Sequence, residues 1–264
     1  TMDQSFFFWL ANLPLALSAP LIIGRGVALS LIGTYVTSNL FTDAELQANN
    51  AVGAPKFTFI GQVYSVTLAL ALVGGWDVYQ SARDGVQREA VVLVALDGAS
   101  QVFSEPEHQP ARIEIRRTIR LYGHAVVTKE WKTMHQGLDD PEATRRLDRL
   151  VELYTTLKPL NAAQVTSQQN AMRLLEDLTR YRVSRVSTLS NTLVGLIWAL
   201  VLAGALVTIA FTWFLGSPNI LAQATMSAII AAFIMMHLLV ILKLTHPFAG
   251  ETAISPNPIR FASQ

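Results

Sequence analysis

Uncharged apolar stretches dominate both ends of the chain, and a polar segment lies between them. Residues 189–215 contain no charged side chain, and residues 220–242 contain only the ionisable His237. Each stretch exceeds the roughly 20 residues that an α-helix needs to cross the hydrocarbon of a bilayer. The Gly-Ser-Pro-Asn sequence at 216–219 between them is typical of a turn. The pattern therefore predicts an antiparallel pair of membrane-spanning helices.

A further apolar stretch at residues 57–76 follows Pro55 and ends at a Trp-Asp-Val-Tyr sequence. It carries Gly61, Ser65 and Ala69 at a spacing of four, which would let a neighbouring helix approach closely. The pattern predicts that this stretch is the second of four spans.

Residues 6–41 are almost entirely apolar, which is too long for one span and short for two. One interpretation is a short aromatic helix at the membrane interface followed by a span near 20–40. The other is a span at 6–24. Both give four spans in total.

The polar segment is predicted to be helical, because its apolar residues recur at helical spacing. Asp139 and Asp140 before Pro141 are typical of a helix start. No strand pattern is present. We expect helices at 80–103, 109–135, 141–157 and 160–187.

Charge is segregated in the same way. Residues 82–187 hold 16 of the 20 Lys and Arg residues and 14 of the 19 Asp and Glu residues. The core of a soluble protein could not bury the remaining apolar sequence, whereas the hydrocarbon of a bilayer can accommodate it.

We expect an all-α membrane protein whose helical cytosolic domain separates the second and third spans. The predicted parts are an N-terminal membrane part at 1–81, the helical domain at 82–187, two spans at 188–246 and a tail at 247–264.

Arginines flank the polar segment on both sides, at Arg83, Arg88, Arg180, Arg182 and Arg185. Positive residues beside spans favour the cytoplasmic side of the membrane. We therefore expect both termini in the cytoplasm, and the links at 42–55 and 216–219 on the outer side. A bacterial inner membrane would suit this topology.

Several function classes are excluded by the composition. The net charge of +1 offers no basic surface for nucleic acid. The chain has no cysteine, and its five histidines show no metal-ligand spacing. There is no glycine-rich phosphate loop and no hydrolase motif, and Glu130 and His135 are better explained by ion pairing than by catalysis. We expect no enzyme, no cofactor and no bound metal.

The second span offers a set of candidate pore residues. Lys56, Ile60, Tyr64 and Thr67 would share one helix face that combines a cation, an aliphatic group and two hydroxyls. Repeated around a symmetry axis, such a face could form a narrow pore that gates by dewetting. The alternative is simple packing against other spans. His237 in the fourth span is an intramembrane ionisable group, and such groups are functional candidates. The alternative is a neutral histidine hydrogen-bonded to a neighbouring helix.

Short motifs in the second span and the polar segment resemble those of bestrophins. Residues 59–68 (Phe-Ile-Gly-Gln-Val-Tyr-Ser-Val-Thr-Leu) and 76–79 resemble the second membrane helix of that family. Residues 116–122 (Arg-Arg-Thr-Ile-Arg-Leu-Tyr) resemble a stretch of its cytosolic domain. The chain is more similar to the bestrophin-like domain proteins of bacteria and plants, through Glu89-Ala90, Glu130-Trp131 and the closing Pro-Phe-Ala-Gly at 247–250.

The resemblance implies a pentameric anion channel whose neck lies on the second span. Aligning Val66-Thr67-Leu68 places the neck at Lys56, Ile60 and Tyr64. Aligning Trp76 and Tyr79 instead places it at Thr58, Gln62 and Val66. The chain lacks the acidic cluster with which animal bestrophins bind calcium, and His246 replaces a usual Asp of the bestrophin-like proteins, so calcium gating is not expected.

The leading hypothesis is a homo-oligomeric, anion-conducting channel in contact with membrane lipid, inorganic anions and other copies of itself. The alternative is a non-conducting scaffold or accessory subunit that presents its cytosolic helices to a partner. The dense, balanced charge of the polar segment suits either hypothesis.

Overall fold

The computed structural model describes residues 4–134, 140–187 and 195–264, and every regular element in these ranges is helical. The chain forms two compact units. The apolar unit comprises residues 1–79 and 192–252, and the charged unit comprises residues 80–191 and 253–264. The last part of the chain, predicted as one tail at 247–264, is thus divided between the two units.

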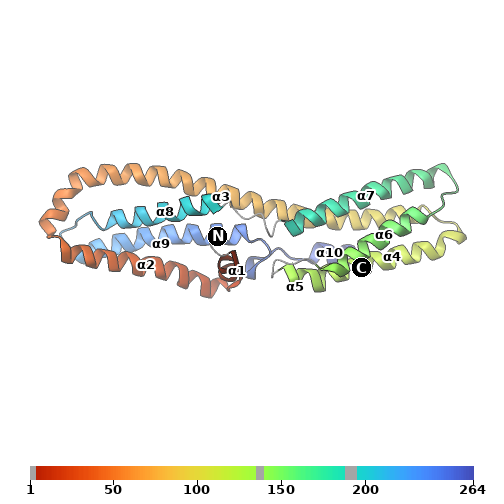
Figure 1. Cartoon of the computed structure of the whole chain (residues 1–264), viewed down its shortest axis with the longest axis horizontal. Coiled ribbons are helices and arrows are strands. Elements are labelled where there is room, and N and C mark those ends of the chain that lie inside the picture. Colours follow the sequence, from red (N-terminus) through yellow and green to blue (C-terminus); the bar gives the residue numbers. More distant parts are fainter. Residues whose placement is uncertain (1–3, 135–139, 188–194) are drawn as a thin grey trace. The chain divides into compact units, whose positions relative to one another are not determined.

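Four helices are long and apolar enough to cross a membrane, as the hydropathy pattern predicts. In the apolar unit they lie side by side (Figure 1). The short helix α1 (Gln4–Asn12) precedes them, so the first arrangement predicted for residues 6–41, a short helix and then a span, is the one observed. The beginning of the predicted third span lies outside the described residues. The four helices are α2 (Leu15–Leu40), α3 (Asp43–Gln101), α8 (Gly195–Thr212) and α9 (Ile220–Thr245).

Small residues of α2 allow its close packing. A Cβ atom added at Gly26 would come within 2.3 Å of Met235 in α9, and one added at Gly33 would come within 2.0 Å of the Trp213 ring. The predicted close approach at Gly61, Ser65 and Ala69 is not seen within the chain, because open space surrounds a Cβ at Gly61 and the other two are exposed. Helix α2, rather than α3, supplies the small-residue face of this unit.

Helix α1 is held to the end of α9 by polar contacts. The buried Lys243 Nζ donates hydrogen bonds to the carbonyl oxygens of Ala11 (2.8 Å) and Leu13 (2.7 Å), at the C-terminal end of α1. A cation is favoured there because the last carbonyls of a helix are unpaired and carry partial negative charge. Glu251, in η3 (Gly250–Thr252), accepts a hydrogen bond from the Leu15 backbone N–H (3.1 Å).

Helix α3 is longer than predicted and contributes to both units. The link expected at 42–55 is helical from Asp43 onward, because Thr42 and Glu45 form a capping box in which each side chain accepts the other's backbone N–H. The helix also continues through 76–79 without the predicted interruption. Pro55 lies inside the helix, where it removes one backbone hydrogen bond and crowds the carbonyl four residues earlier.

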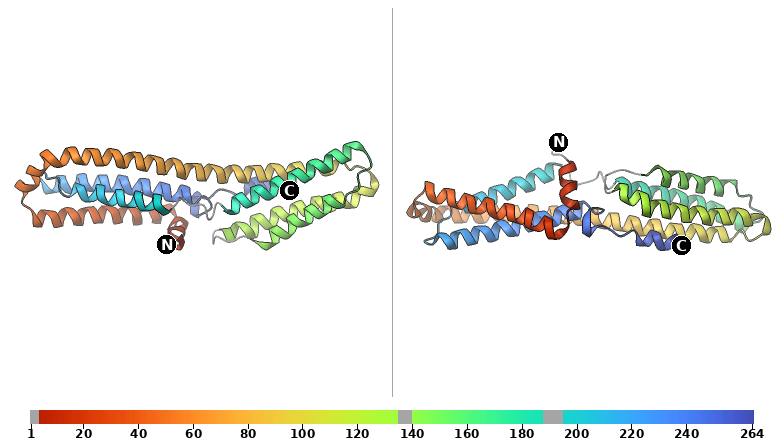
Figure 2. Two further views of the ribbon diagram at one scale, coloured as in Figure 1. Left: turned by 45° about the horizontal axis from the view of Figure 1, so that its top comes forward. Right: turned by 90° about the horizontal axis from the view of Figure 1, so that it is seen from below.

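The charged unit contains the second part of α3 and a set of shorter helices (Figure 2). The helices predicted at 109–135, 141–157 and 160–187 are observed with small shifts at their ends. Asp140 caps α6 by accepting the Glu142 backbone N–H, as predicted, whereas Asp139 and His135 lie outside the described residues. The elements are η1 (Pro106–His108), α4 (Gln109–Ala125), the π-helical segment η2 (Val126–Glu130), α5 (Trp131–Met134), α6 (Pro141–Thr156), α7 (Ala162–Ser187) and α10 (Asn257–Ala262).

A buried ion-pair cluster lies in the core of the charged unit. The fully buried Arg185 of α7 donates to both carboxylate oxygens of Glu89 in α3 (2.7 and 3.1 Å) and to Glu130 in η2 (2.8 Å). Arg182 donates to the other Glu130 oxygen (2.7 Å), and the Tyr122 hydroxyl of α4 donates to Glu89 (2.7 Å). Two cations therefore neutralise two carboxylates, and the cluster joins four segments that are distant in sequence.

The cluster controls the titration of its members. Burial alone would raise the pKa of Glu130, but its contacts with Arg185 and Arg182 outweigh burial and lower it below its usual value. The pKa of Tyr122 is raised well above its usual value by burial and by the negative charge of Glu89. At neutral pH, Glu130 is thus ionised and Tyr122 remains a neutral donor.

We expect Arg185→Met to destabilise the charged unit by about 3–5 kcal/mol, because two buried carboxylates lose their shared cation. Chemical unfolding followed by circular dichroism in detergent measures the change. Arg180→Gln is the matched control, since Arg180 is exposed and its ion pair is with Asp177, one turn earlier in the same helix. Equal stability of the Arg185→Met variant and the wild type would contradict a cluster that holds the unit together.

The Glu130 carboxylate should also make the stability of the charged unit depend on pH. Its lowered pKa in the folded state means that its stabilising contribution is present above the unfolded value of about 4.5 and is lost as pH falls through the folded pKa. Glu130→Gln should therefore flatten the fall in melting temperature below about pH 4.5. Melting curves of the two proteins between neutral and acidic pH test this, and parallel curves would contradict it.

Candidate functional site on α3

The part of α3 in the apolar unit has a covered face and an exposed face. Tyr64, Leu68 and Ala71 are buried, and their spacing of three and four residues places them on one side of the helix. Val66 and Val73, which the 3.6-residue turn places on the opposite side, are 60% and 56% exposed. The covered side packs against α8.

Tyr64 fixes the contact between α3 and α8. Its ring occupies the space beside Gly204, where an added Cβ would lie 2.4 Å from the ring. Its hydroxyl donates a hydrogen bond to the Val201 carbonyl oxygen (3.2 Å), which satisfies the one polar group that the buried ring carries. Tyr64, predicted as a pore candidate, therefore lies inside the protomer.

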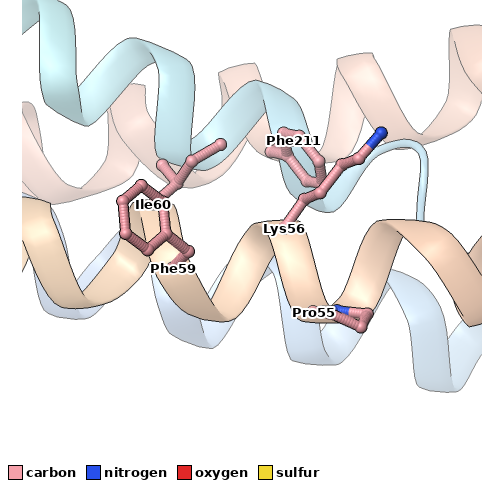
Figure 3. Close-up of a pocket in the computed structure, with 5 residues that line it drawn as sticks. All are labelled: Pro55, Lys56, Phe59, Ile60 and Phe211. Atoms are coloured by element: carbon pink, nitrogen blue, oxygen red, sulfur yellow. The ribbon is translucent and has the colours of Figure 1, made fainter.

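The other members of the first candidate set lie along the edge of the contact with α8. Lys56 and Ile60 line a hollow of about 410 Å³ together with Pro55, Phe59 and Phe211 of α8. In Figure 3 the Lys56 side chain extends beside the Phe211 ring, while Phe59 and Ile60 project from the next turn of α3. Thr67 is partly buried and donates to the Val63 carbonyl oxygen of its own helix (3.2 Å).

The second candidate set occupies the exposed face. Thr58, Gln62 and Val66 are all exposed, and their spacing of four residues aligns them along α3. Thr58 donates its hydroxyl to the Ala54 carbonyl oxygen of the same helix (3.0 Å), so its polarity is satisfied locally. Exposed apolar side chains surround the row, at Phe59, Val63, Leu70 and Val73. The structure thus places the two candidate sets, which the sequence leaves as alternatives, on different sides of α3.

His237 does not belong to either set. It lies in α9, where its Nδ1 is 2.8 Å from the Phe233 carbonyl oxygen one turn earlier. Its ring makes an edge-to-face contact with the Phe233 ring, at 4.4 Å between centroids. The histidine is therefore hydrogen-bonded within its own helix, whereas the sequence interpretation placed its partner on a neighbouring helix.

Sequence reasoning missed several residues that pack the apolar unit. Gly204 and Phe211 lie in an uncharged span where no local pattern distinguishes them, and Lys243 falls one residue beyond the predicted fourth span. A lysine directly after an apolar span was the available signal, since such a charge needs partners. Among the described residues, no three His, Asp or Glu side chains gather as a metal site would require.

Comparison with solved structures identifies proteins that share the fold of this chain. A variant of a bacterial bestrophin homologue from Klebsiella pneumoniae superposes with a TM-score of 0.71 at 12% identity, over 91% of this chain and 96% of that one. A second structure of a Klebsiella pneumoniae bestrophin homologue gives a TM-score of 0.69 at 11% identity, over 91% and 95% of the two chains. A structure described only as a membrane protein gives 0.72 at 12% identity.

The family comparison covers most of the chain. None of the curated proteins compared with the chain matches it. The model of the Bestrophin-like domain matches residues 26–259, which include all four apolar helices except the beginning of α2, and nearly all of the charged unit. The protein therefore belongs to the Bestrophin-like domain family.

Proposed function

We propose that the protein is a homo-oligomeric, anion-conducting channel whose pore is lined by the exposed face of α3. The observation that carries the proposal is the row of Thr58, Gln62 and Val66, which one protomer leaves uncovered. Family membership and the fold of bacterial bestrophin homologues support a channel. A pentamer is the assembly that the family resemblance favours.

A conducting pore would require several copies arranged around an axis, because side chains fill the core of the apolar unit in one protomer. The core between α3, α8 and α9 is occupied by large side chains that include Tyr64, Trp198 and Ile234. A conducting path would instead form where copies of α3 face one another. Each ring of symmetry-related residues would then contribute one chemical group per subunit.

The exposed row has the chemistry that a narrow anion path requires. A ring of Gln62 amides would offer N–H donors in place of the water that an anion loses. Rings of Val66 and Phe59 would form an apolar constriction that can close by dewetting. Lys56, exposed one turn before Ile60, would raise the local anion concentration at that end of the pore. The topology proposed from the arginine distribution places this end on the outer side and the charged unit in the cytoplasm.

Purified protein in planar bilayers under a chloride gradient tests the proposal. We expect unitary currents that reverse near the chloride potential. Val66→Ser should raise the unitary conductance several-fold, because a hydroxyl makes the constriction easier to hydrate. Val207→Ser, the same change on an exposed position of α8, is the control and should leave the conductance unchanged.

Two outcomes would contradict the proposal in different ways. Currents that reverse near the cation potential would keep the channel and overturn its anion selectivity. An inserted, assembled protein that passes no current under any condition tried would favour the non-conducting scaffold.

A further inference from the structure

Four arginines gather around a hollow on the charged unit, far in sequence from the pore candidates. The hollow has a volume of about 360 Å³ and lies between the end of α3 and the first turns of α4. Ser100 and Gln109 contribute polar groups to its wall. Its arginines are Arg112, Arg116, Arg117 and Arg120.

The regular spacing of these arginines explains their convergence. Arg112, Arg116 and Arg120 are four residues apart, so they form one row along α4. Ser100 in the second part of α3 supplies the facing wall. Asp97, in the preceding turn of α3, accepts hydrogen bonds from Arg116 Nε (2.9 Å) and from a terminal nitrogen of Arg116 (3.3 Å). This pair fixes the position of α4 relative to α3 at the hollow.

The charges of the hollow do not balance. Asp97 pairs with Arg116, and Glu114 lies 3.8 Å from Arg117. Among the ion pairs between described residues, none includes Arg112 or Arg120. Arg120 acts on Asp97 only at longer range, and neither Arg112 nor Arg120 forms a close ion pair with a carboxylate of the described residues. Because guanidinium groups stay protonated at any ordinary pH, the hollow keeps about two positive charges in excess.

One of these two groups also has an unused donor inside the protein. The Arg112 Nε atom is buried and has no hydrogen-bond partner among the residues that the structure describes. A buried donor without an acceptor is unfavourable, and the fork formed by Nε and a terminal nitrogen matches two oxygens of one phosphate or carboxylate group. An oxyanion in the hollow would neutralise the excess charge, and the Arg112 guanidinium group that lines the hollow would donate to it.

We propose that this hollow is a binding site for a phosphate-bearing anion, held by Arg112 and Arg120. A phosphate group matches the excess charge, because a phosphate ester carries about −1.5 to −2 at neutral pH. The volume falls near the lower end of the range for small-molecule sites, about 300–1,000 Å³, so it accommodates one or two phosphate groups with little else. The source is either a soluble phosphate compound or the headgroup of a phosphorylated lipid. The proposal does not depend on conduction by α3.

Calorimetric titration of the full chain in detergent tests the site with two probes, inorganic pyrophosphate and a short-chain phosphatidylinositol phosphate. We expect saturable binding of at least one probe to the wild type. Arg112→Lys keeps the charge but loses the Nε fork, and Arg120→Gln loses the charge, so each should raise the Kd about tenfold or more. Arg173→Gln, an exposed arginine of α7 in the same unit, is the matched control and should leave the Kd unchanged.

The two probes also separate the two sources. Tighter binding of pyrophosphate would assign the site to a soluble phosphate compound, and tighter binding of the lipid would assign it to a headgroup. Circular dichroism and size-exclusion chromatography confirm that the variants remain folded. The site is overturned if neither probe binds saturably, or if both variants bind as tightly as the Arg173→Gln control.

Discussion

The contact between Tyr64 and Gly204 determines which side of α3 the protomer leaves free. The glycine provides the space for the ring, and the Val201 carbonyl oxygen accepts a hydrogen bond from the Tyr64 hydroxyl, so the large side chain is packed and its polar group is satisfied. A helix held in this way cannot rotate without removing a buried polar group from its partner. The rotation fixed at Tyr64 therefore leaves Gln62 and Val66 on the open side, and the proposed pore follows from that orientation.

The charged unit depends on a different interaction, the neutralisation of Arg185 inside the core. A buried guanidinium group tolerates few arrangements, because its donors must meet carboxylates at hydrogen-bond distance. Glu89 of α3 and Glu130 of η2 accept its hydrogen bonds. The Trp131 ring also lies against this guanidinium group, with 5.5 Å between the guanidinium carbon of Arg185 and the ring centroid. The short motifs Glu89-Ala90 and Glu130-Trp131, which carried the family resemblance, thus contain the partners of one buried cation.

The sequence predicts the helical class and the four apolar spans, because hydropathy and helical spacing are local properties. It misplaces the start of α3, since the helix begins at the Thr42 to Glu45 capping box and continues through Pro55. Neither the pairing of Arg185 nor the position of Gly204 could be predicted, because both depend on residues more than about 50 positions apart in sequence. For the same reason, the sequence motifs gave two registers for the candidate site, and our proposal of the second one rests on the packing of Tyr64 inside the protomer.

Thiol modification of single-cysteine variants tests most directly whether the exposed face of α3 lines the pore. The chain has no cysteine, so each introduced thiol is the only one present. A charged thiol reagent should block currents through Gln62→Cys and Val66→Cys channels and leave Tyr64→Cys channels unaffected, provided that this last variant assembles. Block at Ile60→Cys and Tyr64→Cys, with no effect at Gln62→Cys and Val66→Cys, would contradict the account and place the other register at the pore.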